Sequence, residues 1–254
     1  EILESKKIKT GIYHGVSSDP TVHQVNNIVQ GVLKGHFNMI VALGGGSVID
    51  ASKAASVIVC QGGRAEEYLI ETKAVDSSSL PVIALPTTAG TGAELSKGAI
   101  ISWPEKQMKG GIRGDALFAD QAIVDPELTL TLPIEQLRLT GFDIFTHAVE
   151  TYISRQAKPL TAIYSREAIK AVTHYLPLAL QNQQNMEART QLSFHSMLMG
   201  YNLANSSTCL PHRLQYPLGT MTNTAHALGL AALYPAWILT TFNASKEKFN
   251  DVSG

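Results

Sequence analysis

Four side chains in the second half of the sequence have the chemistry to bind one divalent metal ion. Asp143 and His147 are four residues apart, and such positions share one face of a helix. His212 and His226 flank Pro217-Leu-Gly219, which we expect to fold the chain back so that both imidazoles face one point. One carboxylate and three imidazoles suit Fe²⁺ or Zn²⁺ better than Ca²⁺ or Mg²⁺, which prefer oxygen ligands.

Spacing alone leaves a second interpretation of these residues open. An aspartate and a histidine four apart on a helix more often form a solvated pair or a capping interaction. Spacing also does not separate His212 and His226 from the five remaining histidines without a partner at ligand spacing: His14, His23, His36, His174 and His195. Because His195 follows a helical pattern beside Phe194, we expect it to be satisfied in the core or at an interface.

A glycine-rich turn in the first half has the composition of a phosphate site. Residues 38–43 form a continuous apolar run, which predicts a strand covered on both faces. Gly44, Gly45, Gly46 and Ser47 follow, and then a helical pattern over 48–59. The glycines allow a bulky anion to approach the backbone, and the helix start offers unpaired N–H groups for a diphosphate. The G-x-G-x-x-G fingerprint is absent, and a tight turn with Ser47 as N-cap is the alternative.

A second loop of small residues follows another apolar run, residues 81–86. Thr87, Thr88 and Thr91 have hydroxyls that reach phosphate or ribose oxygens, although such runs also occur in plain loops. Both loops lie at carboxyl ends of predicted parallel strands and so face one crevice. A third strand is predicted over 121–125. Asp50 and Lys53, one turn into the first helix, either orient its loop or form a surface pair.

The order of these patterns predicts two domains. Strands alternate with helices up to residue 131, which favours an α/β dinucleotide-binding domain with a mostly parallel sheet over residues 1–131. After Pro133 only helical patterns follow, notably over 162–178 and 187–205. We therefore predict an all-α C-terminal metal-binding domain over residues 132–254.

Composition excludes several classes of protein. Of 254 residues, 44% are hydrophobic and 16% charged, and the net charge is -1. This composition indicates neither a disordered chain nor binding to nucleic acid or to an anionic membrane. Cys60 and Cys209 form no C-x-x-C pair, which favours a reduced, cytoplasmic setting. We expect no apolar run of the ~20 residues that span a bilayer and no signal peptide. Since residues 1–7 resemble the end of a helix and 246–254 are polar, we expect a fragment.

Four coupled motifs resemble one known family, the iron-containing (group III) alcohol dehydrogenases. They are Gly44-Gly-Gly-Ser-Val-Ile-Asp-Ala-Ser-Lys53, Pro86-Thr-Thr-Ala-Gly-Thr-Gly-Ala-Glu94, Ile123-Val-Asp-Pro-Glu-Leu128 and Gly141-Phe-Asp-Ile-Phe-Thr-His-Ala-Val-Glu150. The resemblance implies an N-terminal NAD(P) domain, a C-terminal helical metal domain and hydride transfer between NAD or NADP and an alcohol or aldehyde.

The resemblance also implies roles for single residues. The metal ligands would be Asp143, His147, His212 and His226, with Fe²⁺ favoured over Zn²⁺. The pyrophosphate turn would be Gly45, Gly46 and Ser47, with Asp50, Thr87, Thr88 and Thr91 also at the nucleotide and Lys109 near its ribose. Family members carry the first strand before residue 1 and further helices after residue 254, and they form dimers or larger homo-oligomers.

One departure from the family bears on proton transfer. Many relatives have a second histidine four residues after the third ligand, where this chain has Tyr216. A tyrosine, with a pKa of about 10, is a poorer proton shuttle at neutral pH but still donates a hydrogen bond. Two alternatives remain: a related glycerol dehydrogenase or dehydroquinate synthase, and a non-catalytic nucleotide-binding paralogue.

Overall fold

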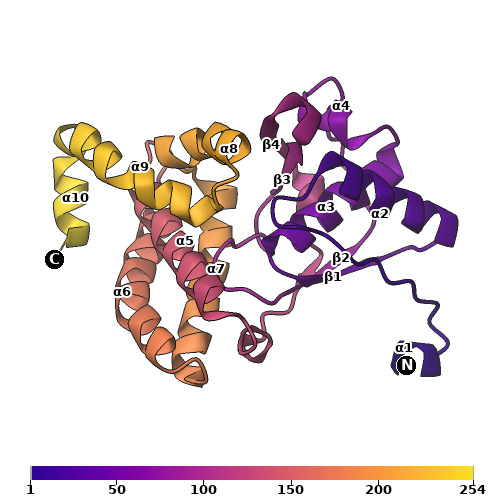
Figure 1. The fold of residues 1–254 in the computed structure, drawn as a ribbon, viewed down its shortest axis with the longest axis horizontal. Coiled ribbons are helices and arrows are strands. Elements are labelled where there is room, and N and C mark those ends of the chain that lie inside the picture. Colours follow the sequence, from indigo (N-terminus) through magenta and orange to yellow (C-terminus); the bar gives the residue numbers. More distant parts are fainter. Residues whose placement is uncertain (1, 254) are drawn as a thin grey trace.

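The structure, a computed structural model, describes residues 2–253 and has two halves (Figure 1). One half holds all the described strands: β1 (Ile40–Gly44), β2 (Val82–Pro86), β3 (Gly98–Trp103), β4 (Met108–Arg113) and β5 (Gln121–Ala122). It also holds the first helices: α1 (Ile2–Ser5), α2 (Val22–Gly35), α3 (Gly46–Gln61) and α4 (Ala65–Leu69). The other half is helical: α5 (Ile134–Ile153), α6 (Pro159–Gln181), α7 (Met186–Asn205), α8 (Leu210–Thr222), α9 (His226–Thr241) and α10 (Lys246–Ser253). This arrangement confirms the predicted fold class.

The strands form a parallel sheet and a separate hairpin. β1 pairs with β2 from Ile40↔Val82 to Gly44↔Pro86, and β2 pairs with β5, all parallel. The two loops that follow β1 and β2 therefore leave the same edge, as the sequence predicts. β3 and β4 form an antiparallel hairpin that the sequence patterns did not indicate.

Several expectations about the elements need correction. β5 ends at Ala122, because Asp125, the predicted end of that strand, instead caps a 3-10 turn by accepting from the Glu127 N–H at 3.0 Å. β1 is not covered on both faces, because Val41 and Leu43, which point to the same face, are 54% and 58% exposed within the described residues. The expected helix end over 1–7 appears as α1, and Glu1 itself lies outside the described residues.

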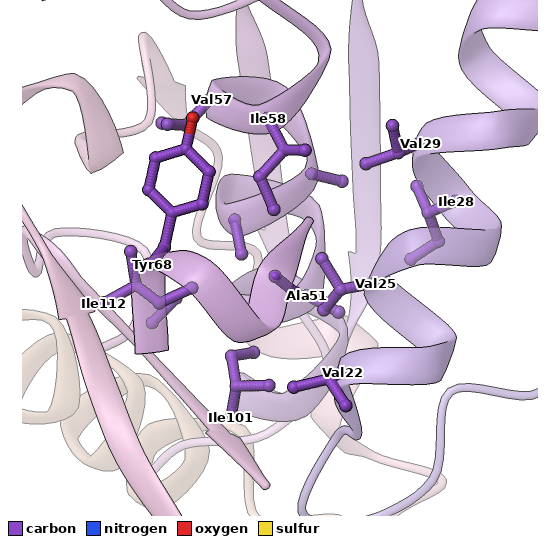
Figure 2. Packing of buried hydrophobic residues seen from close by; sticks show 14 of the residues in the cluster. Val22, Val25, Ile28, Val29, Ala51, Val57, Ile58, Tyr68, Ile101 and Ile112 are labelled. Atoms are coloured by element: carbon purple, nitrogen blue, oxygen red, sulfur yellow. The ribbon is translucent and has the colours of Figure 1, made fainter. Parts of the chain in front are cut away.

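Each half has its own hydrophobic core. In the first, Val22, Val25 and Ile28 of α2 meet α3 and the β3–β4 hairpin (Figure 2). The apolar residues of α2 recur every three or four positions, which is why one face of that helix is buried. The second core joins α5, α6, α7 and α9 and also takes in Ala89 from the loop after β2. That loop therefore packs against the helical half.

The C-terminal helices include one strongly apolar segment. His226–Ala244 is long and apolar enough to cross a membrane, judged by length and composition, although 28% of it is buried. Our expectation that no apolar run reaches this length is therefore wrong. Tyr234 and Trp237 of this segment are buried in the helical core, so its inner face belongs to that half of the fold.

Candidate metal and nucleotide sites

Four polar side chains meet inside the helical half. Asp143 and His147 come from α5, His212 from α8, and His226 is the first residue of α9. The Oδ1 atom of Asp143 lies 3.7 Å from His147 Nδ1, 3.8 Å from His212 Nε2 and 3.7 Å from His226 Nε2. The ligand atoms of Asp143, His212 and His226 all lie within 4.8 Å of one another. The structure thus brings together the four residues that the sequence singles out.

The chain reverses between His212 and His226 at a different place from the one expected. Pro217 lies inside α8. The turn comes after that helix, at Asn223, whose backbone is left-handed with φ of 55°. Asparagine tolerates this conformation better than most residues, so it ends α8 and lets α9 begin three residues later at His226.

The cluster contains buried nitrogen atoms that lack partners. His147 Nδ1 and His212 Nε2 are buried, and neither atom has a hydrogen-bond partner among residues 2–253. An unsatisfied buried polar atom costs about 1–3 kcal/mol, so an arrangement with two beside one carboxylate needs an explanation. A divalent cation with nitrogen and oxygen ligands would satisfy them.

Electrostatics inside the cluster favour a cation too. Burial acts against ionisation of Asp143, but the imidazoles of His147 and His212 outweigh it and hold the pKa of that carboxyl well below its usual range. Burial lowers the pKa of His226 to about 3 and also lowers that of His147. A carboxylate and two neutral imidazoles are therefore present at neutral pH, and metal ligands must be unprotonated in this way.

His212 differs from the other two histidines. Burial would lower its pKa, but the Glu150 carboxylate, 2.7 Å from its Nδ1, and Asp143 raise the pKa to about 9. Without a metal this imidazole therefore carries a proton at neutral pH, which a cation must displace.

The two glycine-containing loops pack against each other at the sheet edge. Gly45 is the N-cap of α3, so Ser47 lies inside the first turn and the alternative of Ser47 as cap is wrong. A Cβ on Gly46 would lie 2.5 Å from Thr91 Oγ1, and one on Gly45 would lie 3.2 Å from Thr88 Cγ2. Glycine at these positions lets the start of α3 lie directly against the loop of residues 87–93 that follows β2, which we call the threonine loop.

Asp50 and Lys53 are not a surface pair. Lys53 is fully buried, and its Nζ donates to the carbonyls of Ala93 at 2.7 Å and Ser96 at 3.1 Å. Asp50, 3.5 Å from Lys53 Nζ, accepts from the Ile100 N–H at 2.8 Å. Burial lowers the pKa of Lys53 and raises that of Asp50. The pair therefore ties α3 to the end of the threonine loop and to β3.

Lys109 and Tyr216 meet where β4 faces α8. The Lys109 ammonium lies 2.5 Å from the carboxylate of Asp19 and 6.0 Å from the centre of the Tyr216 ring. Asp19 lies shortly before α2. Apart from the proline that follows it, no sequence pattern marks this residue. Burial raises the pKa of the Tyr216 hydroxyl, so this group stays protonated at neutral pH.

The threonine loop also touches α7 of the helical half. The Gly90 N–H donates to Ser196 Oγ of α7 at 2.7 Å, and Gly92 crosses the backbone of Gly200 so closely that a Cβ on Gly200 would lie 2.2 Å from Gly92 O. His195, expected in the core or at an interface, is 8% exposed, and its Nδ1 bonds to Gln191 O at 2.8 Å. The threonine loop is thus fixed directly to the helical half, which carries the acid–histidine cluster.

The sequence missed two polar residues behind the histidines. Glu150 ends the motif Gly141–Glu150 that contains Asp143 and His147. A charged residue three positions after His147, among apolar neighbours, was a signal that could have identified it. Gln215 gave none, because its importance comes from the packing of α8 on α9.

The fold and the clusters together define a class: an α/β sheet with paired glycine loops, joined to a helical bundle with a buried acid–histidine cluster. Residues 1–126 match the family model described as iron-containing alcohol dehydrogenase. Residues 138–254 match the model described as Fe-containing alcohol dehydrogenase family, C-terminal. The chain belongs to the iron-containing alcohol dehydrogenase family.

Comparisons with individual relatives support this family assignment. The chain is 34% identical over 235 residues to long-chain-alcohol dehydrogenase 1 of Geobacillus thermodenitrificans, covering 92% of this chain and 59% of that one. It superposes on an iron-containing alcohol dehydrogenase from Thermotoga maritima with a TM-score of 0.90 and 32% identity, over 99% of this chain and 68% of that one. It also resembles a sulfoacetaldehyde reductase from Bifidobacterium kashiwanohense, whose structure contains NAD⁺, with a TM-score of 0.85 and 30% identity, over 94% and 66%.

The chain is shorter than these relatives. It spans 55% to 63% of the length of the first three curated relatives that it matches. The glycerol dehydrogenase or dehydroquinate synthase alternative is not favoured by matches that carry alcohol dehydrogenase descriptions.

Proposed function

We propose that this chain carries the catalytic core of an NAD(P)- and metal-dependent alcohol dehydrogenase, which transfers a hydride between an alcohol carbon and C4 of nicotinamide. One observation supports this most strongly. A buried carboxylate lies within 3.8 Å of three imidazole nitrogens. Helix α5, which carries Asp143 and His147, packs against the loop after β2, where a Cβ on Gly90 would lie 2.8 Å from Thr140 O. This loop leaves the carboxyl end of the parallel sheet. Such sheet ends are where nucleotides bind.

Asp143, His147, His212 and His226 would hold the metal ion, Fe²⁺ rather than Zn²⁺ on the family's preference. When bound, the ion supplies Lewis acidity toward the substrate oxygen. The protein holds the ligands in register: α5 fixes Asp143 and His147 one turn apart, and the turn at Asn223 brings His226 opposite His212.

The nucleotide would lie across the two loops. Gly45, Gly46 and Ser47 offer backbone N–H groups at the start of α3 for the pyrophosphate. The hydroxyls of Thr87, Thr88 and Thr91 line the facing loop. We place Asp50 and Lys109 toward the ribose, for NAD or NADP alike.

Tyr216 would act as a hydrogen-bond donor. Its hydroxyl stays protonated at neutral pH because burial raises its pKa, so it holds a proton where many relatives have a titrating histidine. Tyr216 is a residue of α8, and its ring centre lies 6.0 Å from the ammonium of Lys109 on β4. It therefore lies at the contact between the two halves.

We propose a domain boundary between residues 131 and 132, in the turn before α5. We propose a small-molecule alcohol or aldehyde as substrate, no nucleic acid or membrane as partner, and a homodimer or larger oligomer. A cytoplasmic setting suits the two cysteines, which are both free.

The test uses protein purified without oxygen. Elemental analysis is expected to find one iron per chain, and NADH or NADPH oxidation is expected with part of an aldehyde panel. His212→Ala should lose both metal and turnover and keep nucleotide affinity, whereas the exposed His174→Ala should keep all three. A metal-loaded protein inactive on every aldehyde would favour the non-catalytic paralogue, and full activity in His212→Ala would overturn the assignment.

A further inference from the structure

The two histidines that face Asp143 from α8 and α9 are each held from behind. His212 Nδ1 lies 2.7 Å from Glu150 Oε1, and His226 Nδ1 lies 2.5 Å from Gln215 Oε1. Because both partners are oxygen acceptors, each Nδ1 carries a hydrogen, which leaves each Nε2 as the atom available to a metal ion, in His212 after that ring has lost its second proton. Those Nε2 atoms are the ones that lie 3.8 Å and 3.7 Å from Asp143 Oδ1. The outer hydrogen bonds therefore select the ring atom that is offered to the cluster.

Glu150 is a fully buried carboxylate that is fixed from several directions. Its Oε2 accepts from the Cys209 N–H at 2.6 Å, and its Oε1 accepts from the Tyr234 hydroxyl at 3.2 Å in addition to His212. No lysine or arginine within residues 2–253 pairs with it. A buried carboxylate without a cationic partner is costly. The protonated His212 supplies that charge here, and a metal ion bound at its Nε2 would replace the charge of the displaced proton.

Gln215 is fixed by packing. Its side chain is fully buried one turn after His212 on α8. A Cβ on Gly219 would lie 2.8 Å from Gln215 Nε2, and one on Gly229 would lie 3.0 Å from Gln215 Cγ. Two glycines thus make the room that this amide occupies, and neither leaves it space to turn away from His226.

We propose that Glu150 and Gln215 are positioning residues for the metal centre, and that the Glu150–His212 pair contributes more to metal affinity than the Gln215–His226 pair. This inference rests on the proposed function. A carboxylate behind an imidazole fixes the ring and raises its basicity toward a metal, and losing such a partner weakens metal binding by about 10- to 100-fold. The neutral amide of Gln215 fixes the ring without adding negative charge.

The experiment measures affinity for Zn²⁺ and Co²⁺ by chelator competition in the full-length protein. Glu150→Gln, which keeps the shape and an oxygen acceptor, is expected to weaken binding about 10- to 100-fold. Gln215→Met is expected to weaken it less than tenfold. The visible bands of bound Co²⁺ should shift in both variants. Glu94→Gln, at a buried carboxyl whose charged neighbours are Lys53 and Asp50, serves as control and should bind as the wild type does.

Two results distinguish a failure of this inference from a failure of the proposed function. A wild-type protein without affinity for either metal would overturn both. A metal-binding wild type with Glu150→Gln within twofold of it would overturn the inference alone. Nitrogen NMR of the zinc-loaded wild type tests the same point without any variant, should Glu150→Gln fail to fold: His212 and His226 should show Nε2 bound and Nδ1 protonated, and the reverse pattern would contradict the inference.

Discussion

The crossing of Gly92 and Gly200 gives a prediction whose size follows from the structure. Gly200→Ala would place a Cβ 2.2 Å from Gly92 O and 3.1 Å from Gly92 Cα, so the two backbones must separate by roughly 1 Å to reach ordinary contact. Gly92 has φ of +61°, and its loop is anchored to Ser196. Neither backbone can therefore yield without moving the threonine loop away from α7.

The expected effects fall on both stability and turnover. Overpacking of this kind costs about 1–3 kcal/mol of unfolding free energy. A displacement near 1 Å between nucleotide and metal lowers turnover by about 10²-fold. Urea denaturation measures the first effect, and steady-state aldehyde reduction measures the second.

Gly31→Ala is the matched control. Gly31 is exposed in α2, and a Cβ there would meet no atom within 4 Å, so the substitution should stabilise the protein by about 0.5–1 kcal/mol. A Gly200→Ala variant as stable and as active as the wild type would refute the reasoning that this crossing sets the distance between the two sites.

Four further predictions concern buried ionisable groups. Lys53→Met should destabilise the protein by about 3–5 kcal/mol in chemical denaturation, because it leaves Asp50 buried without its cation; a loss below 1 kcal/mol would contradict this. Metal binding near pH 7 should release about one proton, because the pKa of His212 is raised from 6.5 to about 9 in the metal-free protein; calorimetry in buffers of different ionisation enthalpy measures it, and zero release would count against the pairing. By the same shift, the stability that His212 contributes without metal is fully present below pH 6.5 and is lost as the pH rises through 9. Tyr216→His should add an ionisation at about pH 6–7 to the pH–rate profile, and a profile that keeps the wild-type shape would remove Tyr216 from the proton path.

The sequence predicted the parts of this molecule that depend on local pattern. Residues 38–43 and 81–86 are apolar runs followed by small residues, and β1 and β2 with their loops lie there. Asp143 and His147 share a helical face because their spacing dictates it. The β3–β4 hairpin escaped notice because Gly98–Arg113 mixes glycines, charges and apolar residues without clear alternation.

Other features depend on contacts between distant segments. Glu150 and Gln215 matter because α5, α8 and α9 pack together, which no spacing rule conveys. Lys53 looked like half of a surface pair, yet tertiary packing buries it completely. The left-handed turn at Asn223, and not the proline six residues earlier, brings the last two histidines together.

The central claim is that one cation is held by Asp143, His147, His212 and His226. Anomalous diffraction at the iron edge, on crystals of protein prepared without oxygen, tests it most directly. We predict a single strong peak at about 2.0–2.2 Å from a carboxylate oxygen of Asp143 and from one nitrogen of each histidine. A peak at other residues, or iron-loaded protein with no peak at this cluster, would contradict the account.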